Sequence, residues 1–328
     1  MPTLSIVAPA YNEAELVGEF VRRVRTAVEP TGLDFEIVLV DDGSRDEMYG
    51  RIEALHAGDH RVKAVRLSRN FGQEAAIQAG LQFASGDAVV LMDADLQDPP
   101  ELLPEMIAKW KEGVRVVLAE RMSRGESWPR RTATRLFHWL FRRLSRSEER
   151  GDVGLFSLVD RRVVDTLRQM PERHRYLRGL RAYVGFSRAS VSYERPRREG
   201  QPRQSLGKLI RLAADSLFSF SSVPLRMSLF MGLIVSALCM SYALFLVVLR
   251  ILSLCFPDSP FGQFEEAYGF TGFTTIAVAI LFLGGVQLIA IGIIGEYLGR
   301  IYEEVKRRPN YVVERTLGLE VPADQQRG

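Results

Sequence analysis

Two stretches near the C-terminus contain no charged residue at all. They run over Met227–Leu249 and Gly272–Gly295, and no Asp, Glu, Lys or Arg interrupts either of them. Each is long enough for an α-helix to cross the hydrocarbon core of a bilayer, which takes about 20 residues. A pair of buried core helices is the alternative, but such helices seldom run so far without a charge. We therefore expect a two-helix transmembrane domain over residues 226–300.

Basic residues flank these stretches mainly on one side, with Arg250 at the far end of the first stretch as a mild exception that can snorkel outward. Arg211 and Arg226 precede the first stretch, Arg300 and residues 306–308 follow the second, and the connection over 252–271 has no Lys or Arg. Because Lys and Arg are retained on the cytoplasmic side, we expect both termini and the N-terminal domain in the cytoplasm. The chain is then an integral protein of a bacterial-type inner or plasma membrane, with residues 301–328 as a cytoplasmic tail.

A third segment, residues 205–225, has the spacing of an amphipathic helix. Its apolar residues recur every three or four positions from Leu206 to Phe218, and Lys208, Arg211 and Asp215 lie opposite them. Since the segment immediately precedes an uncharged stretch, we interpret it as a helix lying in the membrane interface, with a core-facing helix as the alternative. Residues 130–144 mix arginines with aromatic residues in a similar way and form a second candidate.

The region before residue 204 alternates short apolar runs with helical patterns. Strands are expected at Leu4–Ala8, Phe35–Val40, Val62–Leu67, Ala88–Met92 and Val114–Ala119, and helices at Glu13–Val28, Glu47–His56, Glu74–Ala84 and Glu101–Lys111. This order predicts an α/β domain over residues 1–204 with a mostly parallel sheet covered by helices. Such sheets carry their functional loops at the carboxyl ends of the strands.

Acidic residues follow one of these strands directly. Asp93-Ala94-Asp95 comes after the run Ala88–Met92 and continues into Leu96-Gln97. Carboxylates at the end of a buried strand offer the hard oxygen ligands that a divalent cation and its phosphates require. A solvated acidic turn is the alternative. The spacing indicates a metal-bound nucleotide sugar.

Two further motifs close the first and second strands. These are Pro9-Ala10-Tyr11-Asn12-Glu13 and Asp41-Asp42-Gly43-Ser44. Asp41 is placed to accept a hydrogen bond from a base or a ribose, Tyr11 to cover a ring, and Gly43 to allow a tight turn. Each motif taken singly also fits an ordinary turn or a helix cap, and Asn12 and Ser44 are good N-cap residues.

Together with Asn70-Phe71-Gly72, these motifs resemble those of the family 2 glycosyltransferases with a GT-A fold, which is Rossmann-like. The resemblance covers the first two hundred or so residues. The two uncharged C-terminal stretches narrow this resemblance to the polyprenyl-phosphate glycosyltransferases. The chain is similar to dolichol-phosphate mannose synthases and bactoprenol glucosyltransferases within that group.

The resemblance implies roles for individual residues. It implies a nucleotide site at Pro9, Tyr11, Asn12, Glu13, Asp41, Asp42, Ala94 and Gln97; catalytic residues at Asp93 and Asp95; Mg²⁺ or Mn²⁺ at Asp93, Asp95 and Gln97; and acceptor or diphosphate binding at Arg121, Arg135, Arg197 and Arg203. Arg124, Arg131 and Arg198 lie near enough to these arginines to substitute for them.

The chain departs from the family pattern in two places. Many relatives carry Gly-Asp-Phe-Arg where this chain reads Gly154-Leu155-Phe156-Ser157, so a carboxylate and a guanidinium are absent there. Asp152 is the nearest carboxylate that can contribute to catalysis instead. The basic loop reads Pro202-Arg203-Gln204-Ser205 where a Ser-Lys-Tyr type of sequence is common.

The implied reaction moves one sugar from a nucleotide sugar to undecaprenyl phosphate or a similar polyprenyl phosphate, with metal dependence and inversion at the anomeric carbon. UDP-glucose is the first candidate donor, ahead of N-acetylglucosamine, galactose and mannose donors. A lipid phosphate is already anionic at neutral pH, so no strong general base is required. The expected partners are the nucleotide sugar, the polyprenyl phosphate and membrane lipid. Glycines in the second stretch favour a homo-oligomer, and no nucleic-acid motif is present.

Two other function classes were weighed against this reading. A processive membrane polysaccharide synthase shares the early motifs. Enzymes of that class resemble one another in having a Gln-x-x-Arg-Trp motif, and this sequence does not contain it. A non-catalytic nucleotide-binding membrane scaffold is consistent with the altered residues Leu155 and Ser157. A dinucleotide oxidoreductase and a P-loop protein are excluded, because neither glycine-rich motif is present.

Overall fold

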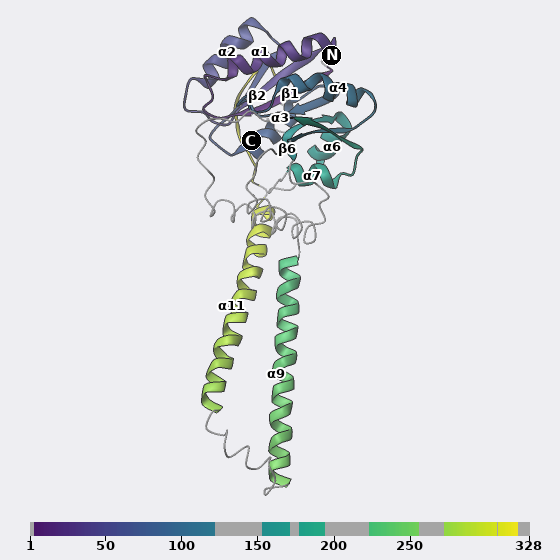
Figure 1. The fold of residues 1–328 in the computed structure, drawn as a ribbon. Coiled ribbons are helices and arrows are strands. Elements are labelled where there is room, and N and C mark those ends of the chain that lie inside the picture. The colour runs from purple at the N-terminus through teal and green to yellow at the C-terminus, as the bar shows by residue number, and fades with distance from the viewer. Residues whose placement is uncertain are drawn as a thin grey trace. The chain divides into compact units, whose positions relative to one another are not determined.

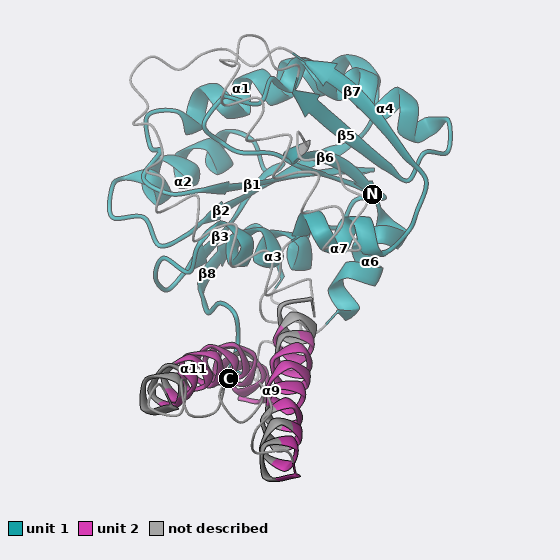
Figure 2. Ribbon diagram, turned by 60° about the horizontal axis from the view of Figure 1, so that its bottom comes forward, with its two compact units in different colours: residues 1–210, 307–328 teal, residues 211–306 magenta. Residues whose placement is uncertain are grey.

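The chain folds into two compact units. The computed structural model describes residues 3–121, 153–170, 177–193, 223–255, 272–306 and 308–320. The first unit comprises residues 1–210 together with 307–328, and the second comprises residues 211–306 (Figure 2). The C-terminal segment therefore belongs to the same unit as the N-terminal domain.

A single mixed sheet forms the centre of the first unit (Figure 1). Its strands are β1 Leu4–Ala10, β2 Phe35–Asp41, β3 Val62–Leu67, β4 Ala88–Leu91, β5 Val116–Arg121, β6 Val153–Asp160, β7 Arg188–Tyr193 and β8 Val313–Leu317. They are ordered β7-β5-β6-β4-β1-β2-β3-β8. The neighbours β3, β2, β1 and β4 run parallel, as the alternation of apolar runs and helical patterns predicts. The α/β fold with a mostly parallel sheet is confirmed.

Helices cover both faces of this sheet. They are α1 Val17–Val28, α2 Met48–Gly58, α3 Gln73–Phe83, α4 Leu103–Lys111, α6 Arg161–Gln169 and α7 Leu177–Tyr183, with short 3-10 turns at Glu29–Thr31 and Pro100–Leu102. One hydrophobic cluster contains the buried residues of α1, α2 and α4, and a second contains those of α3, α6 and α7. Strands buried on both faces explain why the predicted runs are apolar throughout rather than alternating.

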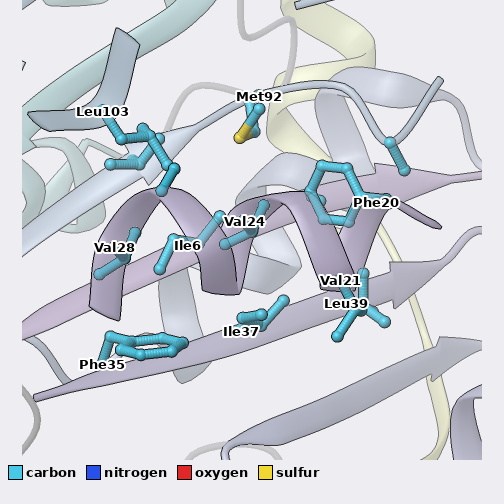
Figure 3. Packing of buried hydrophobic residues seen from close by; sticks show 14 of the residues in the cluster. Ile6, Phe20, Val21, Val24, Val28, Phe35, Ile37, Leu39, Met92 and Leu103 are labelled. Atoms are coloured by element: carbon cyan, nitrogen blue, oxygen red, sulfur yellow. The ribbon is translucent and has the colours of Figure 1, made fainter. Parts of the chain in front are cut away.

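The packing of α1 shows how helical spacing produces one of these layers. Val17, Phe20, Val21, Val24 and Val28 recur every three or four residues and are all buried. Figure 3 shows the last four of these residues lying over side chains of β1 and β2. The helix starts at Val17 instead of at the predicted Glu13, so the residues after β1 are free to form a loop at the edge of the sheet.

Three strands were not predicted because they do not follow the βαβ pattern. β6 pairs antiparallel with both β4 and β5, and β7 pairs parallel with β5 at one edge. β8 follows the second C-terminal helix and pairs antiparallel with β3 at the opposite edge. The chain thus leaves the sheet after β7, passes through the second unit and returns to the sheet at β8.

The second unit contains two long helices, α9 Val223–Cys255 and α11 Gly272–Val305. Many of their large apolar side chains are exposed, including Leu229 and Phe230 in α9 and Leu288 in α11. Within the described residues, Phe282–Val305 is the segment whose length and composition suffice to span a membrane, and the apolar run Ser228–Tyr242 in α9 is shorter. The structure therefore supports one candidate span directly. The interfacial helices expected at 205–225 and 130–144 lie outside the described residues, apart from the first turn of α9.

A buried carboxylate joins several strands at the amino ends of the parallel strands. Glu36 is 1% exposed, and its two oxygens accept hydrogen bonds from Ser5 Oγ (2.6 Å), Ser85 N (2.7 Å) and Lys63 Nζ (2.7 Å). Burial opposes ionisation, but these bonds together hold the pKa of the Glu36 carboxyl below its ordinary value. Glu36 thereby connects β2 to β1, to β3 and to the turn that leads into β4.

We predict that Glu36→Gln lowers the free energy of unfolding at neutral pH by about 1–3 kcal/mol, because buried donors lose a charged acceptor. A carboxyl whose pKa is depressed in the folded state stabilises above its unfolded pKa and loses that contribution as the pH falls through the folded pKa. The difference in the free energy of unfolding between wild type and variant should therefore become smaller as the pH falls. Denaturation of the full chain in detergent between pH 7 and pH 3 measures it, with the exposed Glu105→Gln as control. A gap that is absent or independent of pH would contradict the assignment.

Candidate functional site

The predicted motifs meet at one edge of the sheet. β1 pairs in parallel with β2, with Ala10 opposite Asp41, and with β4, with Val7 opposite Leu91. The segments that follow these three strands therefore leave the sheet side by side. The Tyr11, Asp41 and Asp93 motifs belong to these segments, as expected from the rule for parallel sheets.

The first two loops are hydrogen-bonded to each other. Asn12 N donates to Ser44 Oγ (3.0 Å), and Arg45 N donates to Asn12 Oδ1 (2.9 Å). Asn12 adopts a φ of +55°, a conformation that asparagine tolerates better than most residues. The side chain of Asn12 thus connects the loops after β1 and β2, a role that places it in the wall of the site.

Asp41 has one oxygen committed to the protein and one without a hydrogen bond. The residue is fully buried, and Oδ1 accepts from Ser44 N (2.8 Å). Oδ2 has no hydrogen-bond partner among the described residues and lies 3.6 Å from Arg66 Nε, which also lacks one. Arg66 Nε is 3.0 Å from Glu314 Oε2 of β8. A buried acceptor of this kind is normally satisfied, so Oδ2 is a candidate acceptor for an N–H or O–H of a ligand.

Asp42 has a different role from its neighbour. Its Oδ1 accepts from Phe71 N (2.7 Å) and its Oδ2 from Gly72 N (2.9 Å), so both oxygens hold the loop between β3 and α3. Burial raises the pKa of the Asp42 carboxyl, and the two backbone bonds limit that rise. The structure therefore explains the Asn70-Phe71-Gly72 signature as the loop that receives this carboxylate.

The acidic motif lies at the end of β4. Asp93 and Asp95 are half-buried, while Ala94 and Gln97 are buried. Gln73 Nε2, from the first residue of α3, donates to Asp93 Oδ1 (2.5 Å), and Asp95 Oδ1 accepts from Gln97 N (3.0 Å). Gln73 was not predicted, although it directly follows the Asn70-Phe71-Gly72 signature.

The turn inside this motif is strained. Leu96 has a φ of +60°, which is costly for a residue with a Cβ. Left-handed non-glycine residues persist where the surroundings fix them, and they concentrate at functional sites. The conformation of Leu96 reverses the chain between Asp95 and Gln97 and keeps both residues at the edge of the sheet.

The donor set at this edge fits a hard divalent cation. Asp93, Asp95 and Gln97 carry side-chain oxygens that could hold such a cation, and the described residues contain no group of three or more His, Cys, Asp and Glu side chains placed to enclose a metal. Mg²⁺ typically binds through one or two carboxylates while substrate phosphates and water complete its shell. The arrangement therefore suits a cation that arrives with a diphosphate rather than one held by the protein alone.

Arg121, at the end of β5, is held by a tyrosine and a buried carboxylate. Arg121 Nε donates to Tyr193 Oη (3.2 Å), and Tyr193 Oη donates to Asp98 Oδ1 (2.8 Å). Burial and the charge of Asp98 raise the pKa of Tyr193 to about 12, so the phenol stays protonated. Asp98 belongs to the segment that begins with Asp93, so these bonds connect the acidic motif to Arg121. The sequence analysis missed both Asp98 and Tyr193.

The remaining predicted residues are placed as follows. Pro9 is buried in β1, Tyr11 is 40% exposed just beyond it, and the backbone oxygen of Glu13 accepts from Leu16 N and Val17 N where α1 begins. Asp152, Arg135, Arg197 and Arg203 lie outside the described residues, as do Arg124, Arg131 and Arg198.

A groove between α1 and α4 lies apart from these motifs. Its volume is about 750 Å³, and it is lined by residues such as Arg23, Ala27, Glu101 and Ile107. The Arg23–Glu101 ion pair, 2.7 Å between Nη2 and Oε2, joins α1 to the 3-10 turn that precedes α4. None of the predicted site residues lines the groove.

Comparison with known proteins gives a consistent result. The model of the Glycosyl transferase family 2 matches residues 5–168. An uncharacterized glycosyltransferase of Synechocystis sp. is 43% identical over 97% of this chain and 96% of its own length. The Shigella flexneri SfII prophage-derived bactoprenol glucosyl transferase is 38% identical over 95% of this chain and 98% of its own length.

Solved structures match this chain at low identity. Glucosyl-3-phosphoglycerate synthase from Mycobacterium tuberculosis, in complex with Mn²⁺, UDP and phosphoglyceric acid, is 21% identical. The alignment covers 66% of this chain and 78% of that chain, with a TM-score of 0.46.

Gly43 provides a test of how the loop after β2 fits against the loop after β3. Its φ is +68°, and a Cβ there would lie 2.4 Å from the backbone carbonyl carbon of Arg69. We predict that Gly43→Ala lowers the free energy of unfolding by more than the roughly 1–2 kcal/mol that a left-handed alanine costs, because the β3–α3 loop must also move.

Gly32 offers a matched control for this variant. It has nearly the same φ, +69°, but no atom lies within 4 Å of its added Cβ. Denaturation of Gly43→Ala and Gly32→Ala in detergent therefore separates the stability lost through the left-handed backbone conformation from the stability lost through the close contact with Arg69. Equal losses in the two variants would show that the loops after β2 and β3 do not meet as described.

Proposed function

The chain belongs to the Glycosyl transferase family 2 and is a glycosyltransferase, and from that membership we propose that it transfers one sugar from a nucleotide sugar to a polyprenyl phosphate. The observation that carries the proposal is the meeting of Asp41, the Asp93–Asp95 motif and Arg121 in one connected arrangement. These groups suit, in turn, a base, a diphosphate with its cation and an acceptor phosphate.

The acceptor is proposed from the relatives. Proteins named bactoprenol glucosyl transferase, from Shigella flexneri and its phages, align over 95% of this chain and 98% of their own lengths. Alignment over nearly the full length includes the helices α9 and α11 as well as the sheet. UDP-glucose is accordingly the first donor to test.

We infer the donor site from the polar groups that lie at the edge of the sheet. Asp41 Oδ2 is the buried acceptor available to the base, and the exposed ring of Tyr11 lies one residue beyond β1 to cover it. Asp93 and Asp95, with Gln97 beside them, are the residues that would hold Mg²⁺ or Mn²⁺. When bound there, the cation supplies neutralisation of the charge that develops on the leaving diphosphate.

The protein's own residues account for the rest of the reaction. A guanidinium such as that of Arg121 binds a phosphate through paired N–H groups and offsets its repulsion from the donor diphosphate. Tyr193 and Asp98 fix the direction in which Arg121 points. The acceptor oxygen is already negatively charged at neutral pH, so the absence of a carboxylate at Leu155 does not remove a required base. Attack opposite the leaving group inverts the anomeric carbon.

The topology of the chain supports two membrane crossings. β8 pairs with β3 in the same sheet that contains β1, and α9 and α11 lie between them in sequence. A chain that returns to its starting side must cross the membrane an even number of times. If Phe282–Val305 spans the bilayer, α9 must span it as well. The basic residues Arg226 and Arg300 then favour the cytoplasmic face for the sheet.

The reaction is tested with the purified full chain, labelled UDP-glucose, undecaprenyl phosphate and Mn²⁺. We expect a single-sugar glycolipid, whereas a processive synthase would give long polymers on the same gel. Asp95→Asn keeps the size of the side chain and the acceptor for Gln97 N but removes the charge. It should lower turnover by about 100-fold or more, as expected for loss of a group that stabilises developing charge.

The control is Asp34→Asn, which removes an exposed carboxylate next to the opposite end of β2. It should retain wild-type turnover. The proposal fails if no UDP- or GDP-sugar gives a product under conditions in which an active relative works. Wild-type turnover in Asp95→Asn would instead remove the acidic motif from the mechanism.

Tyr193→Phe tests the support of Arg121. The variant keeps the ring, which packs edge-on against Phe156, but loses the hydroxyl between Arg121 and Asp98. Loss of about 1 kcal/mol of hydrogen bonding should raise the KM for polyprenyl phosphate about fivefold, with little change in the KM for the donor. Tyr183→Phe, at a residue that is 79% exposed, is the control. An equal rise in both KM values would contradict a role specific to the acceptor.

A further inference from the structure

A buried arginine contacts β6 at the residues where this chain departs from its family pattern. Arg181 of α7 is 1% exposed. Nη1 donates to Ser157 Oγ (2.5 Å) and to the backbone oxygen of Leu155 (3.3 Å), and Nη2 donates to the backbone oxygen of Gly154 (3.2 Å). Burying a guanidinium costs free energy unless its donors are satisfied and its charge is offset. A residue of this kind therefore calls for a specific reason.

The strand that Arg181 contacts lies beside the acidic motif. β6 runs antiparallel to β4 with Ser157 opposite Leu91, two residues before Asp93. Because the two strands are antiparallel, the residues that precede Ser157 on β6 lie toward the end of β4 from which the chain continues to Asp93. The three oxygens that Arg181 binds belong to this part of β6. Its guanidinium thus fixes the strand next to the one that presents Asp93.

A second connection leads from α7 to the same carboxylate through α3. Glu74 lies in the first turn of α3, and its Oε2 accepts from Leu177 N, the first residue of α7 (3.3 Å). Burial raises the pKa of the Glu74 carboxyl, and the positive charges of Arg178 and Arg181 oppose that rise. The preceding residue, Gln73, donates to Asp93 Oδ1. The first residue of α7 therefore bonds to the helix turn whose Gln73 donates to Asp93.

We propose that Arg181 is a positioning residue for the cation site. Its guanidinium, which comes from α7, lies beside Ser157, where the family pattern has an arginine on β6. The argument rests on the proposed function, because it takes Asp93 and Asp95 to be the cation ligands. Ser157 Oγ is only 2.5 Å from Arg181 Nη1. A longer basic side chain at position 157 would consequently reach the space that the Arg181 guanidinium fills, so the charge can be supplied from either element.

This last point provides the test, which is an exchange of the two residues. Arg181→Ser removes the guanidinium, and the double variant Arg181→Ser/Ser157→Arg returns it from β6. Residues that orient metal ligands typically change metal affinity about 10-fold or more when they are removed. We expect Arg181→Ser to weaken the binding of Mn²⁺ in the presence of UDP by about that factor, and the double variant to recover most of it.

Binding is measured by the electron paramagnetic resonance signal of free Mn²⁺, using the full chain in detergent, with the melting temperature recorded in parallel. Arg162→Ser removes an exposed arginine of α6 and should leave both readouts unchanged. If Arg181→Ser does not fold, Ser157→Ala replaces it. That variant removes only the hydroxyl that accepts from Nη1, and it should weaken Mn²⁺ binding in the same direction.

The outcomes separate this inference from the proposed function. A lower melting temperature with wild-type Mn²⁺ affinity, in Arg181→Ser or in Ser157→Ala, would make Arg181 a structural residue only and overturn the inference. So would a double variant that folds but stays as weak as Arg181→Ser. A wild-type chain that binds Mn²⁺ and UDP but gives no glycolipid would leave the inference standing and contradict the transferase proposal. A wild-type chain that binds no Mn²⁺ would overturn both.

Discussion

The parallel pairing of β1 with β2 and with β4 is the constraint on which the rest of the site depends. It brings the segments after three strands to one edge of the sheet, although the helices α1, α2 and α3 lie between them along the chain. The carboxylates at this edge then divide into two groups. Both oxygens of Asp42 and one of Asp41 bind backbone N–H groups and fix the loops. Asp93, Asp95 and the second oxygen of Asp41 are the groups that we propose for the ligand, although Asp93 and Asp95 each also accept one hydrogen bond through Oδ1.

The sequence was sufficient to predict the parts of the fold that obey a local rule. Apolar runs such as Val62–Leu67, alternating with helical spacing, identified the parallel strands with their ends correct to about two residues. The motifs at Asp41 and Asp93 lie at the ends of parallel strands as predicted, and their role in binding stays a prediction. The strands β6 and β8 were missed because they are antiparallel and no periodic pattern shows which neighbour they join.

Individual roles were harder to predict than membership of the site. Asn12 and Asp42 were expected at the nucleotide, and the structure shows that each holds a loop. Tyr193 and Arg181 carried no recognisable signal, because the partners that give them a role, Asp98 and Ser157, lie far away in sequence. The C-terminal strand β8 was not predicted either. Its Glu314 Oε2 lies 3.0 Å from Nε of Arg66, which lies beside Asp41. Through β8 the segment that follows α11 reaches the candidate donor site.

The proposed transfer requires a cation and a diphosphate to bind together at Asp93 and Asp95, because the described residues contain no group of three or more His, Cys, Asp and Glu side chains that could hold a metal. The most direct measurement is calorimetric titration of UDP into the full-length protein in detergent, with and without Mn²⁺. The account predicts that Mn²⁺ strengthens UDP binding by about tenfold or more, within the usual range for coupled ligands. Equal affinity for UDP in the presence and absence of the metal would contradict it.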